Sequence, residues 1–237
     1  MPMYRESSIR SVLKTVSWRL FATLTTVAIV YAFTAKLNIA LAIGGIEMVL
    51  KLVLYYLHER GWNYIHLGRK EIEPKVLWLT GLSGSGKSTI GEKLYNDLKG
   101  KGFKVEYLDG DRVRDIFPNT GFSKEERDRH VKRIGFLASM LEKNGVIVVA
   151  SFISPYEESR QFVRSLCNNF VEIHLSTPLE ECIKRDVKGL YARAIKGELR
   201  NFTGINDPYE EPLNPEIRID TTNISVSEAV RKISKFV

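Results

Sequence analysis

Cysteine is scarce in this chain of 237 residues, which contains only Cys167 and Cys182. So few thiols in so long a chain do not indicate a disulfide framework, and we expect both to be packing residues. A strong charge imbalance is also missing, because the net charge of +7 is divided nearly evenly between the first 74 residues and the rest. Neither part is basic enough to indicate nucleic-acid binding by charge alone.

Two long apolar runs lie near the N-terminus. Residues 20–35 carry no charge, and residues 37–57 are interrupted only by Glu47 and Lys51. Since a helix needs about 20 apolar residues to cross a bilayer, these runs predict a transmembrane hairpin with spans at about 18–35 and 37–57, in a domain of residues 1–67. A cleavable signal peptide or a buried soluble hairpin are the alternatives. The second span that follows at once disfavours the former, and the lack of a polar face disfavours the latter.

Positive charges lie on one side of this hairpin. Only Lys36 lies between the spans, and the others flank them as Arg5, Arg10, Lys14 and Arg19 before and Arg60, Arg69 and Lys70 after. Because cytoplasmic flanks of membrane spans are rich in lysine and arginine, we expect a multi-pass membrane protein with both termini in the cytoplasm. The segment resembles a small uncharacterised two-helix membrane domain, through the Ser-Trp-Arg run at 17–19 and the His-Glu-Arg-x-Trp run at 58–62.

A short polar stretch at 68–74 ends in Pro74 and reads as a linker. The second domain is therefore predicted at 75–237. Its first motif is Gly-Leu-Ser-Gly-Ser-Gly-Lys-Ser-Thr at 81–89, which follows a strand-like run and precedes a helical pattern. That context disfavours an accidental match in a surface loop.

The motif is typical of a phosphate-binding loop. Glycines let backbone N–H groups turn toward phosphates, Lys87 brings a cation to the β and γ oxygens, and Ser88 offers a hydroxyl to Mg²⁺. We therefore expect a nucleoside triphosphate and Mg²⁺ at the loop. The predicted contacts are Gly81, Leu82, Ser83, Gly84, Ser85, Gly86, Lys87, Ser88 and Thr89.

Strand-like and helical patterns alternate along the rest of the chain. Strands are expected near 76–80, 104–108, 146–152, 171–175 and 217–219. This order predicts an α/β fold of the P-loop NTPase type, with a parallel sheet wrapped by helices. Ligands bind at the carboxyl ends of such strands, and the polar segments 81–89, 109–114 and 151–156 all fall there.

Further motifs follow the phosphate loop in order. They are Asp109-Gly110-Asp111 with Arg114, Thr120-Gly121-Phe122-Ser123 with Arg127, Phe-Ile-Ser-Pro-Tyr at 152–156, Arg-Asp-Val-Lys-Gly-Leu-Tyr at 185–191, Phe-Thr-Gly-Ile at 202–205 and Asp-Pro-Tyr-Glu at 207–210. With this set, the chain from about residue 74 onward resembles adenylylsulfate kinase. That family uses ATP to phosphorylate the 3′-hydroxyl of adenosine 5′-phosphosulfate.

The resemblance implies roles for individual residues. Catalytic residues would be Lys87, Asp111, Ser154 and Lys188, with Ser88 and Asp111 at the metal and Arg185 at ATP. The implied acceptor site comprises Asp109, Asp111, Arg114, Phe122, Arg127, His130, Ile153, Ser154, Lys188, Leu190 and Phe202.

Several of these roles also have a physical basis. Arginine forks suit the phosphosulfate, and two phenylalanine rings suit the adenine. Asp111 could instead cap a helix, and Lys188 could be a solvated loop residue instead of part of a lid. Ser154 matches a serine that forms a phosphoenzyme in the family, but in-line transfer needs no such intermediate, so we expect it at the acceptor site first.

Two residues depart from the family pattern. His130 stands where the family usually has Asn, and its charge is expected to vary near neutral pH. Glu157 stands where the family usually has Arg, which reverses a charge near the acceptor site.

The leading hypothesis is thus a membrane-tethered adenylylsulfate kinase with a cytoplasmic catalytic domain. The alternatives are a nucleotide-dependent regulatory module of a membrane complex and a P-loop kinase for another small acceptor. We expect a separate sulfurylase to supply the substrate, since no such domain precedes the phosphate loop. The sequence leaves the oligomeric state open, with a homodimer among the alternatives.

Overall fold

The computed structural model of the chain describes residues 3–6, 8–32, 37–65, 69–117 and 121–237. The chain divides into two compact units, Pro2–Ile72 and Glu73–Val237. The last residues of the first predicted span, 33–35, lie outside the described residues, as do Gly68 of the predicted linker and Thr120.

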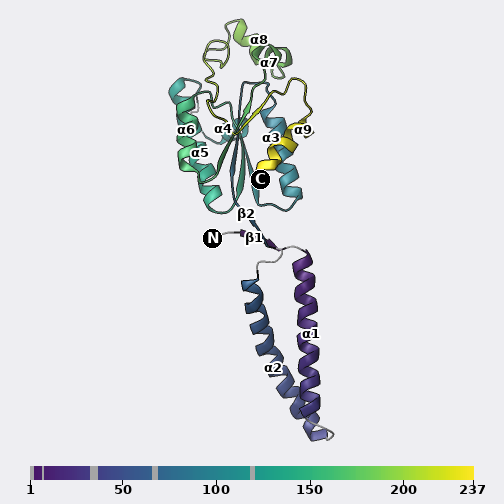
Figure 1. Cartoon of the computed structure of the whole chain (residues 1–237). Coiled ribbons are helices and arrows are strands. Elements are labelled where there is room, and N and C mark those ends of the chain that lie inside the picture. The colour runs from purple at the N-terminus through teal and green to yellow at the C-terminus, as the bar shows by residue number, and fades with distance from the viewer. Residues whose placement is uncertain (1–2, 7, 33–36, 66–68, 118–120) are drawn as a thin grey trace. The chain divides into compact units, whose positions relative to one another are not determined.

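The N-terminal unit is a pair of long helices and a small ribbon. Helices α1 (Ser8–Ala32) and α2 (Leu37–Tyr64) lie side by side (Figure 1). Strands β1 (Met3–Glu6) and β2 (Arg69–Ile72) pair in antiparallel fashion. Among the residues whose side chains are described, no helix is both long and apolar enough to cross a membrane.

Polar contacts join the two helices at one end. The fully buried guanidinium of Arg10 donates to the carbonyl oxygens of Trp62, at 2.5 Å, and of Ile65. Arg10 thus holds one carbonyl group in the last turn of α2 and one just beyond the end of the helix. The Arg10 guanidinium also lies 5.1 Å from the centre of the Trp62 ring.

The two short motifs of this unit meet in space. The Ser17 hydroxyl lies 2.9 Å from His58 Nε2, and Trp62 Nε1 donates to the same nitrogen at 3.0 Å. The Trp18 ring packs edge-on against Tyr55, with ring centres 4.9 Å apart. These contacts give the motif residues of the membrane-domain resemblance a structural role in joining α1 to α2.

The second unit is a parallel sheet covered by helices on both faces. Its strand order is β4-β5-β3-β6-β7, and each neighbouring pair is parallel. Helices α5 and α6 cover one face, and α3 and α9 cover the other (Figure 1). The strands are β3 (Val76–Thr80), β4 (Val105–Asp109), β5 (Ile147–Ser151), β6 (Phe170–Leu175) and β7 (Ile217–Ile219).

All five strands lie within one residue of their predicted positions. The helices between and after them are α3 (Lys87–Gly100), α4 (Gly110–Ile116), α5 (Lys124–Lys143), α6 (Glu157–Leu166), α7 (Leu179–Arg185), α8 (Leu190–Ile195), α9 (Val226–Ile233) and the 3₁₀ turn η1 (Ser234–Phe236). The α/β fold with a parallel sheet is thereby confirmed.

The central strand β3 sets the position of the site. All five of its residues are buried, because a parallel strand in the middle of a sheet has helices on both faces. Trp78 stacks on Phe152, with ring centres 5.3 Å apart. This packing brings the segment after β5 beside the carboxyl end of β3.

Candidate active site

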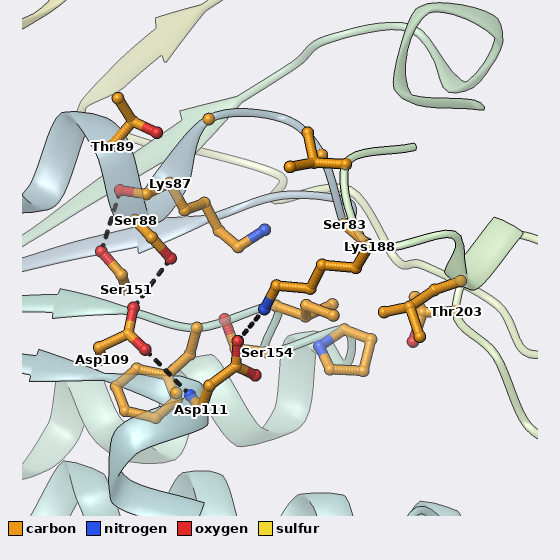
Figure 2. Close-up of a pocket in the computed structure, with 18 of the residues that line it drawn as sticks. Ser83, Lys87, Ser88, Thr89, Asp109, Asp111, Ser151, Ser154, Lys188 and Thr203 are labelled. Carbon is orange, nitrogen blue, oxygen red and sulfur yellow. Dashed lines mark hydrogen bonds and ion pairs between the residues drawn. The ribbon is translucent and has the colours of Figure 1, made fainter. Parts of the chain in front are cut away.

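A cavity of about 680 Å³ opens at the carboxyl ends of the strands, and Figure 2 shows part of its lining. It collects predicted site residues from segments far apart in the sequence. Those that line it are Ser83, Gly84, Gly86, Lys87, Ser88, Thr89, Asp109, Asp111, Arg114, Phe122, Arg127, His130, Ile153, Ser154, Arg185, Lys188, Leu190 and Phe202. Gly81, Leu82 and Ser85 do not line it, and Leu82 faces a second cavity.

The loop between β3 and α3 curves tightly before the helix begins at Lys87. Gly84 and Gly86 have φ angles of 76° and 93°, in the left-handed region that favours glycine. A Cβ at Gly84 would also lie 3.2 Å from the carbonyl oxygen of Cys182. The loop leads into the N-terminus of α3, where backbone N–H groups and the helix dipole favour an anion.

The Lys87 side chain, from the first residue of α3, reaches back to the start of this loop. Its ammonium donates to the carbonyl oxygens of Gly81, at 2.9 Å, and Leu82, at 2.6 Å. Burial lowers the pKa of Lys87 to about 8. The loop thus holds a partly desolvated cation that an anionic phosphate would stabilise.

Ser88 and Asp109 form the oxygen-rich part of the cavity (Figure 2). The Ser88 hydroxyl donates to Asp109 Oδ2 at 2.8 Å, and the Tyr107 hydroxyl donates to the same oxygen at 3.0 Å. Burial raises the pKa of Asp109, but the hydrogen bonds from Ser88 and Tyr107 outweigh burial and leave the pKa below its usual value. A hydroxyl beside an ionised carboxylate fits Mg²⁺, which takes one or two protein oxygens and keeps water and phosphate as its other ligands.

Asp109 also begins helix α4. Its Oδ1 accepts from the backbone N–H of Asp111, at 3.1 Å, and of Arg112, at 3.4 Å. Asp109 is therefore the N-cap, and the alternative interpretation of Asp111 as the cap is wrong. The Asp111 side chain instead projects into the cavity, where it forms an ion pair with Lys188 (Figure 2).

An arginine and an aromatic ring form the opposite side of the cavity. The Arg114 guanidinium lies 4.5 Å from the centre of the Phe122 ring and donates to the Gly121 carbonyl oxygen at 2.8 Å. Burial and the charge of Arg127 lower the pKa of Arg114. Two guanidinium groups near one exposed ring favour an anionic ligand with a flat, aromatic part.

Arg127 is more deeply buried than Arg114, and its guanidinium N–H groups donate to other groups of the protein. Its guanidinium donates to the carbonyl oxygen of Phe122 at 2.9 Å, to the Thr203 hydroxyl and to the Asn201 carbonyl oxygen. It also lies 3.6 Å from Asp207 Oδ2. Arg127 therefore fixes the segment that carries Phe202 beside Phe122.

His130 is a buried side chain with no protein partner for either ring nitrogen among the described residues. It lies between the rings of Phe117 and Phe152. Burial, with the charges of Arg114 and Arg133, lowers the pKa of His130 to about 4. The prediction that its charge varies near neutral pH is therefore wrong, because this environment penalises the charged form.

The Glu157 carboxylate does not face the cavity. Its carboxylate pairs with the buried guanidinium of Arg160 on the next turn of α6, and its backbone N–H donates to Glu210 at 2.7 Å. Glu157 is not among the residues that line the cavity. The expected charge reversal near the acceptor site is thus largely neutralised inside the protein.

The predicted site residues omit Ser151 and Thr221, which also line the cavity and hold the phosphate loop. The Ser151 hydroxyl donates to the carbonyl oxygen of Lys87 at 3.1 Å, and Thr221 donates to that of Ser85 at 3.0 Å. Arg185, predicted at ATP, donates to the Thr221 hydroxyl at 2.9 Å and the Gly84 carbonyl oxygen at 3.4 Å. Thr221 could be predicted only from its place after the last strand, because polar residues that follow parallel strands lie at the edge of the sheet where ligands bind.

The sheet order, the glycine loop after its central strand and the lysine that reaches back to that loop define a P-loop phosphotransferase. A family model described as adenylylsulphate kinase matches residues 73–220. An adenylyl-sulfate kinase from Picosynechococcus is 52% identical over 161 residues, which cover 68% of this chain and 91% of that protein. The chain therefore belongs to the adenylylsulphate kinase family, and the enzyme class predicted from the sequence is confirmed.

Other comparisons agree for the same part of the chain. A probable adenylyl-sulfate kinase from Pseudomonas aeruginosa is 51% identical over 159 residues, covering 67% of this chain and 74% of that protein. The Mycobacterium tuberculosis adenylylsulfate kinase, solved with the ATP analogue AMPPNP and adenylylsulfate, superposes with a TM-score of 0.66. It is 36% identical, and the match covers 69% of this chain and 97% of that one. A second family model, described as a predicted membrane protein (DUF2061), matches residues 12–63.

The lowered pKa of His130 predicts how acid affects the stability of this unit. An unfolded histidine takes up a proton near pH 6.5, whereas folded His130 does so only near pH 4. Stability should therefore fall as the pH is lowered between these values, and His130→Asn should remove about 2 kcal/mol of the loss between pH 7.5 and 5.0. Hydrogen exchange of the β3 and β5 amides at both pH values measures this difference. Equal pH dependence in both proteins would contradict the buried neutral imidazole.

Proposed function

We propose that the chain transfers the γ-phosphoryl group of ATP to the 3′-hydroxyl of adenosine 5′-phosphosulfate. The observation that carries this proposal is that one cavity joins the Lys87–Ser88 loop to the Arg114–Phe122 pair. The loop provides charge and N–H groups for a triphosphate, and the pair provides a cation and a ring for a nucleotide acceptor. The AMPPNP and adenylylsulfate of the Mycobacterium structure support this division.

On the donor side, the backbone of the loop residues that line the cavity, Ser83, Gly84 and Gly86 to Thr89, would cradle the phosphates. Lys87 would exchange its carbonyl contacts for phosphate oxygens, and Arg185 would support the loop from the Gly84 side. Ser88, Asp109 and Asp111 would hold Mg²⁺ directly or through water. When bound, the metal would neutralise phosphate charge, which is the main contribution that phosphoryl transfer needs.

On the acceptor side, Phe122 and Phe202 would enclose the adenine. Arg114 would meet the phosphosulfate, and Arg127 would hold both ring-bearing segments in place. His130 would offer its two unpartnered nitrogens as a neutral donor and acceptor. Ile153 and Leu190 would complete the wall around the acceptor.

Asp111 would accept the proton of the attacking 3′-hydroxyl. The bond from the γ-phosphorus to the β-bridging oxygen breaks as the bond to the 3′-oxygen forms, which leaves ADP and 3′-phosphoadenylylsulfate. Lys188, which pairs with Asp111 in this structure, would move to the transferring group when the segment between α7 and α8 closes.

Ser154 would position the acceptor and would not carry a phosphoryl group. Its hydroxyl donates to Thr80 at 3.0 Å and accepts from Trp78 Nε1 at 3.0 Å. A hydroxyl engaged in this way, without a basic partner, is poorly placed to act as a nucleophile.

The N-terminal hairpin would tether this enzyme to a membrane, with the kinase unit in the cytoplasm. The match to a predicted membrane protein family and the two long apolar runs support this proposal. The hairpin would localise an enzyme whose substrate comes from a separate adenylylsulfate-forming enzyme.

The catalytic proposal predicts different kinetic defects for two variants of the full chain, one in kcat and one in KM. Lys87→Ala should lower kcat by at least about 100-fold, because a transition-state charge loses its partner. Arg114→Ala should raise KM for adenylylsulfate by about 10- to 100-fold, since a charge-assisted hydrogen bond contributes roughly 1.5–3 kcal/mol. Formation of ADP and 3′-phosphoadenylylsulfate is followed with ATP and Mg²⁺.

Arg112→Ala is the matched control for Arg114. Arg112 lies on the same helix, is exposed and does not line the cavity, so its kinetics should stay within twofold of the unaltered chain. A chain that binds ATP but forms no 3′-phosphoadenylylsulfate would sink the proposed reaction.

The tether predicts that the full chain stays in the membrane pellet after alkaline carbonate extraction. Val27→Asp with Val30→Asp should release it, because each charge at the centre of a span costs about 2.5–3.5 kcal/mol. Tyr64→Asp, outside the predicted spans, should stay in the pellet. Release of the unaltered chain would contradict the tether.

A further inference from the structure

Arg160 is a charged side chain with no exposed surface, and the reaction described above does not use it. Its Nη1 donates to the carbonyl oxygen of Ser154 at 2.7 Å, and its Nη2 donates to the carbonyl oxygen of Glu210 at 2.7 Å. Nη2 also pairs with the Glu157 carboxylate. A guanidinium removed from water needs such partners, and here two of them are main-chain atoms of other segments.

A buried acid completes the surroundings of this guanidinium. Arg160 Nε lies 2.9 Å from Glu172 Oε1 on β6, an ion pair without hydrogen-bond alignment. The ring of Tyr209 lies below the guanidinium, 5.9 Å from its carbon. Glu172, on a strand of the central sheet, thus provides a fixed anchor for Arg160.

The Ser154 backbone is in an unusual conformation. Its φ angle of 39° places a non-glycine residue in the left-handed region, and such residues persist only where their surroundings hold them. Arg160 holds the Ser154 carbonyl, while Thr80 donates to the Ile153 carbonyl oxygen at 2.7 Å. Both peptide groups that flank the bend are therefore held, and the bend places Ile153 and Ser154 on the cavity wall.

The second main-chain contact holds the far end of the segment that carries Phe202 and Thr203, two other residues of the cavity wall. Glu210 ends the segment that follows Phe202 and Thr203, and this segment is also held by Asp207, which accepts from the Tyr156 hydroxyl at 2.9 Å. Arg160 therefore links the 152–156 loop to the 202–210 segment. The first segment lines the acceptor side of the cavity through Ile153 and Ser154, and the second lines it through Phe202 and Thr203.

We propose that Arg160 is a positioning residue that preforms the acceptor half of the site by locking the Ser154 bend to the 202–210 segment. The assignment rests on the proposed function, because it takes this half as the adenylylsulfate site. Arg160 itself does not line the cavity, so it acts through the backbone it holds.

The test compares Arg160→Lys with Arg164→Lys in the full chain. Arg164 is a matched control because it lies on the same helix and pairs with the same acid, with Nη2 3.2 Å from Glu172 Oε2. Within the described part of the chain it bonds to Glu216 and not to Ser154 or Glu210. A lysine at 160 keeps the charge but loses the planar fork that reaches two carbonyl groups at once. We expect Arg160→Lys to raise KM for adenylylsulfate at least tenfold with KM for ATP within twofold, and Arg164→Lys to change neither.

A second pair of variants covers the case in which a single substitution disrupts folding. Arg160→Gln with Glu172→Gln removes the charges of this fully buried pair together. The Glu157 carboxylate, which also loses Arg160, is partly exposed to water. Arg164→Gln with Glu216→Gln is the control. The double variant at 160 and 172 should show the same selective rise in KM for adenylylsulfate, and the double variant at 164 and 216 should not. Circular dichroism of all four proteins verifies that they are folded.

The outcomes separate this assignment from the reaction it rests on. Equal KM values for adenylylsulfate in the 160 and 164 variants, or a rise for ATP as large as that for adenylylsulfate, would overturn the positioning role alone. An unaltered chain that neither binds nor turns over adenylylsulfate, by calorimetry and by product formation, would overturn the proposed function together with it.

Discussion

The active site is arranged around one contact. The buried ammonium of Lys87 donates hydrogen bonds to the carbonyl oxygens of Gly81 and Leu82. A cation removed from water needs oxygen partners, and the tight glycine loop provides them from the chain just before the lysine. This contact fixes the end of β3, the start of α3 and the direction of the loop amides together. Burial lowers the pKa of Lys87 to about 8. A phosphate that replaces the carbonyl groups would therefore stabilise the charged form of the ammonium.

The rest of the cavity follows from the order of the strands. A central β3 flanked by β5 and β6 brings the segments after β4 and β5 to the same edge of the sheet. Asp109 and Ser154 therefore lie near the phosphate loop although they are distant in sequence. The acceptor half depends less on the sheet and more on buried arginines, because Arg127 and Arg160 hold loops that have no strand of their own.

Much of this arrangement can be predicted from local sequence. The phosphate loop and all five strands can be located because glycine spacing and apolar runs are local signals. The separate tasks of Asp109 and Asp111 cannot be assigned in this way, because a difference of two residues in the first turn of α4 decides which carboxylate caps the helix and contacts Ser88. The neutral state of His130 and the pairing of Glu157 likewise depend on neighbours from other segments.

The central claim is that one cavity holds two separable half-sites, a phosphate half around Lys87 and an acceptor half around Arg114. Titration calorimetry of the full chain with AMPPNP and, separately, with adenylylsulfate tests it most directly. Lys87→Ala should weaken AMPPNP binding at least tenfold and leave adenylylsulfate binding within about twofold, and Arg114→Ala should do the reverse, since an interaction lost from one half costs the ligand of that half. If either substitution weakens both ligands equally, or if adenylylsulfate binding depends on Lys87 and not on Arg114, the division of the cavity is wrong.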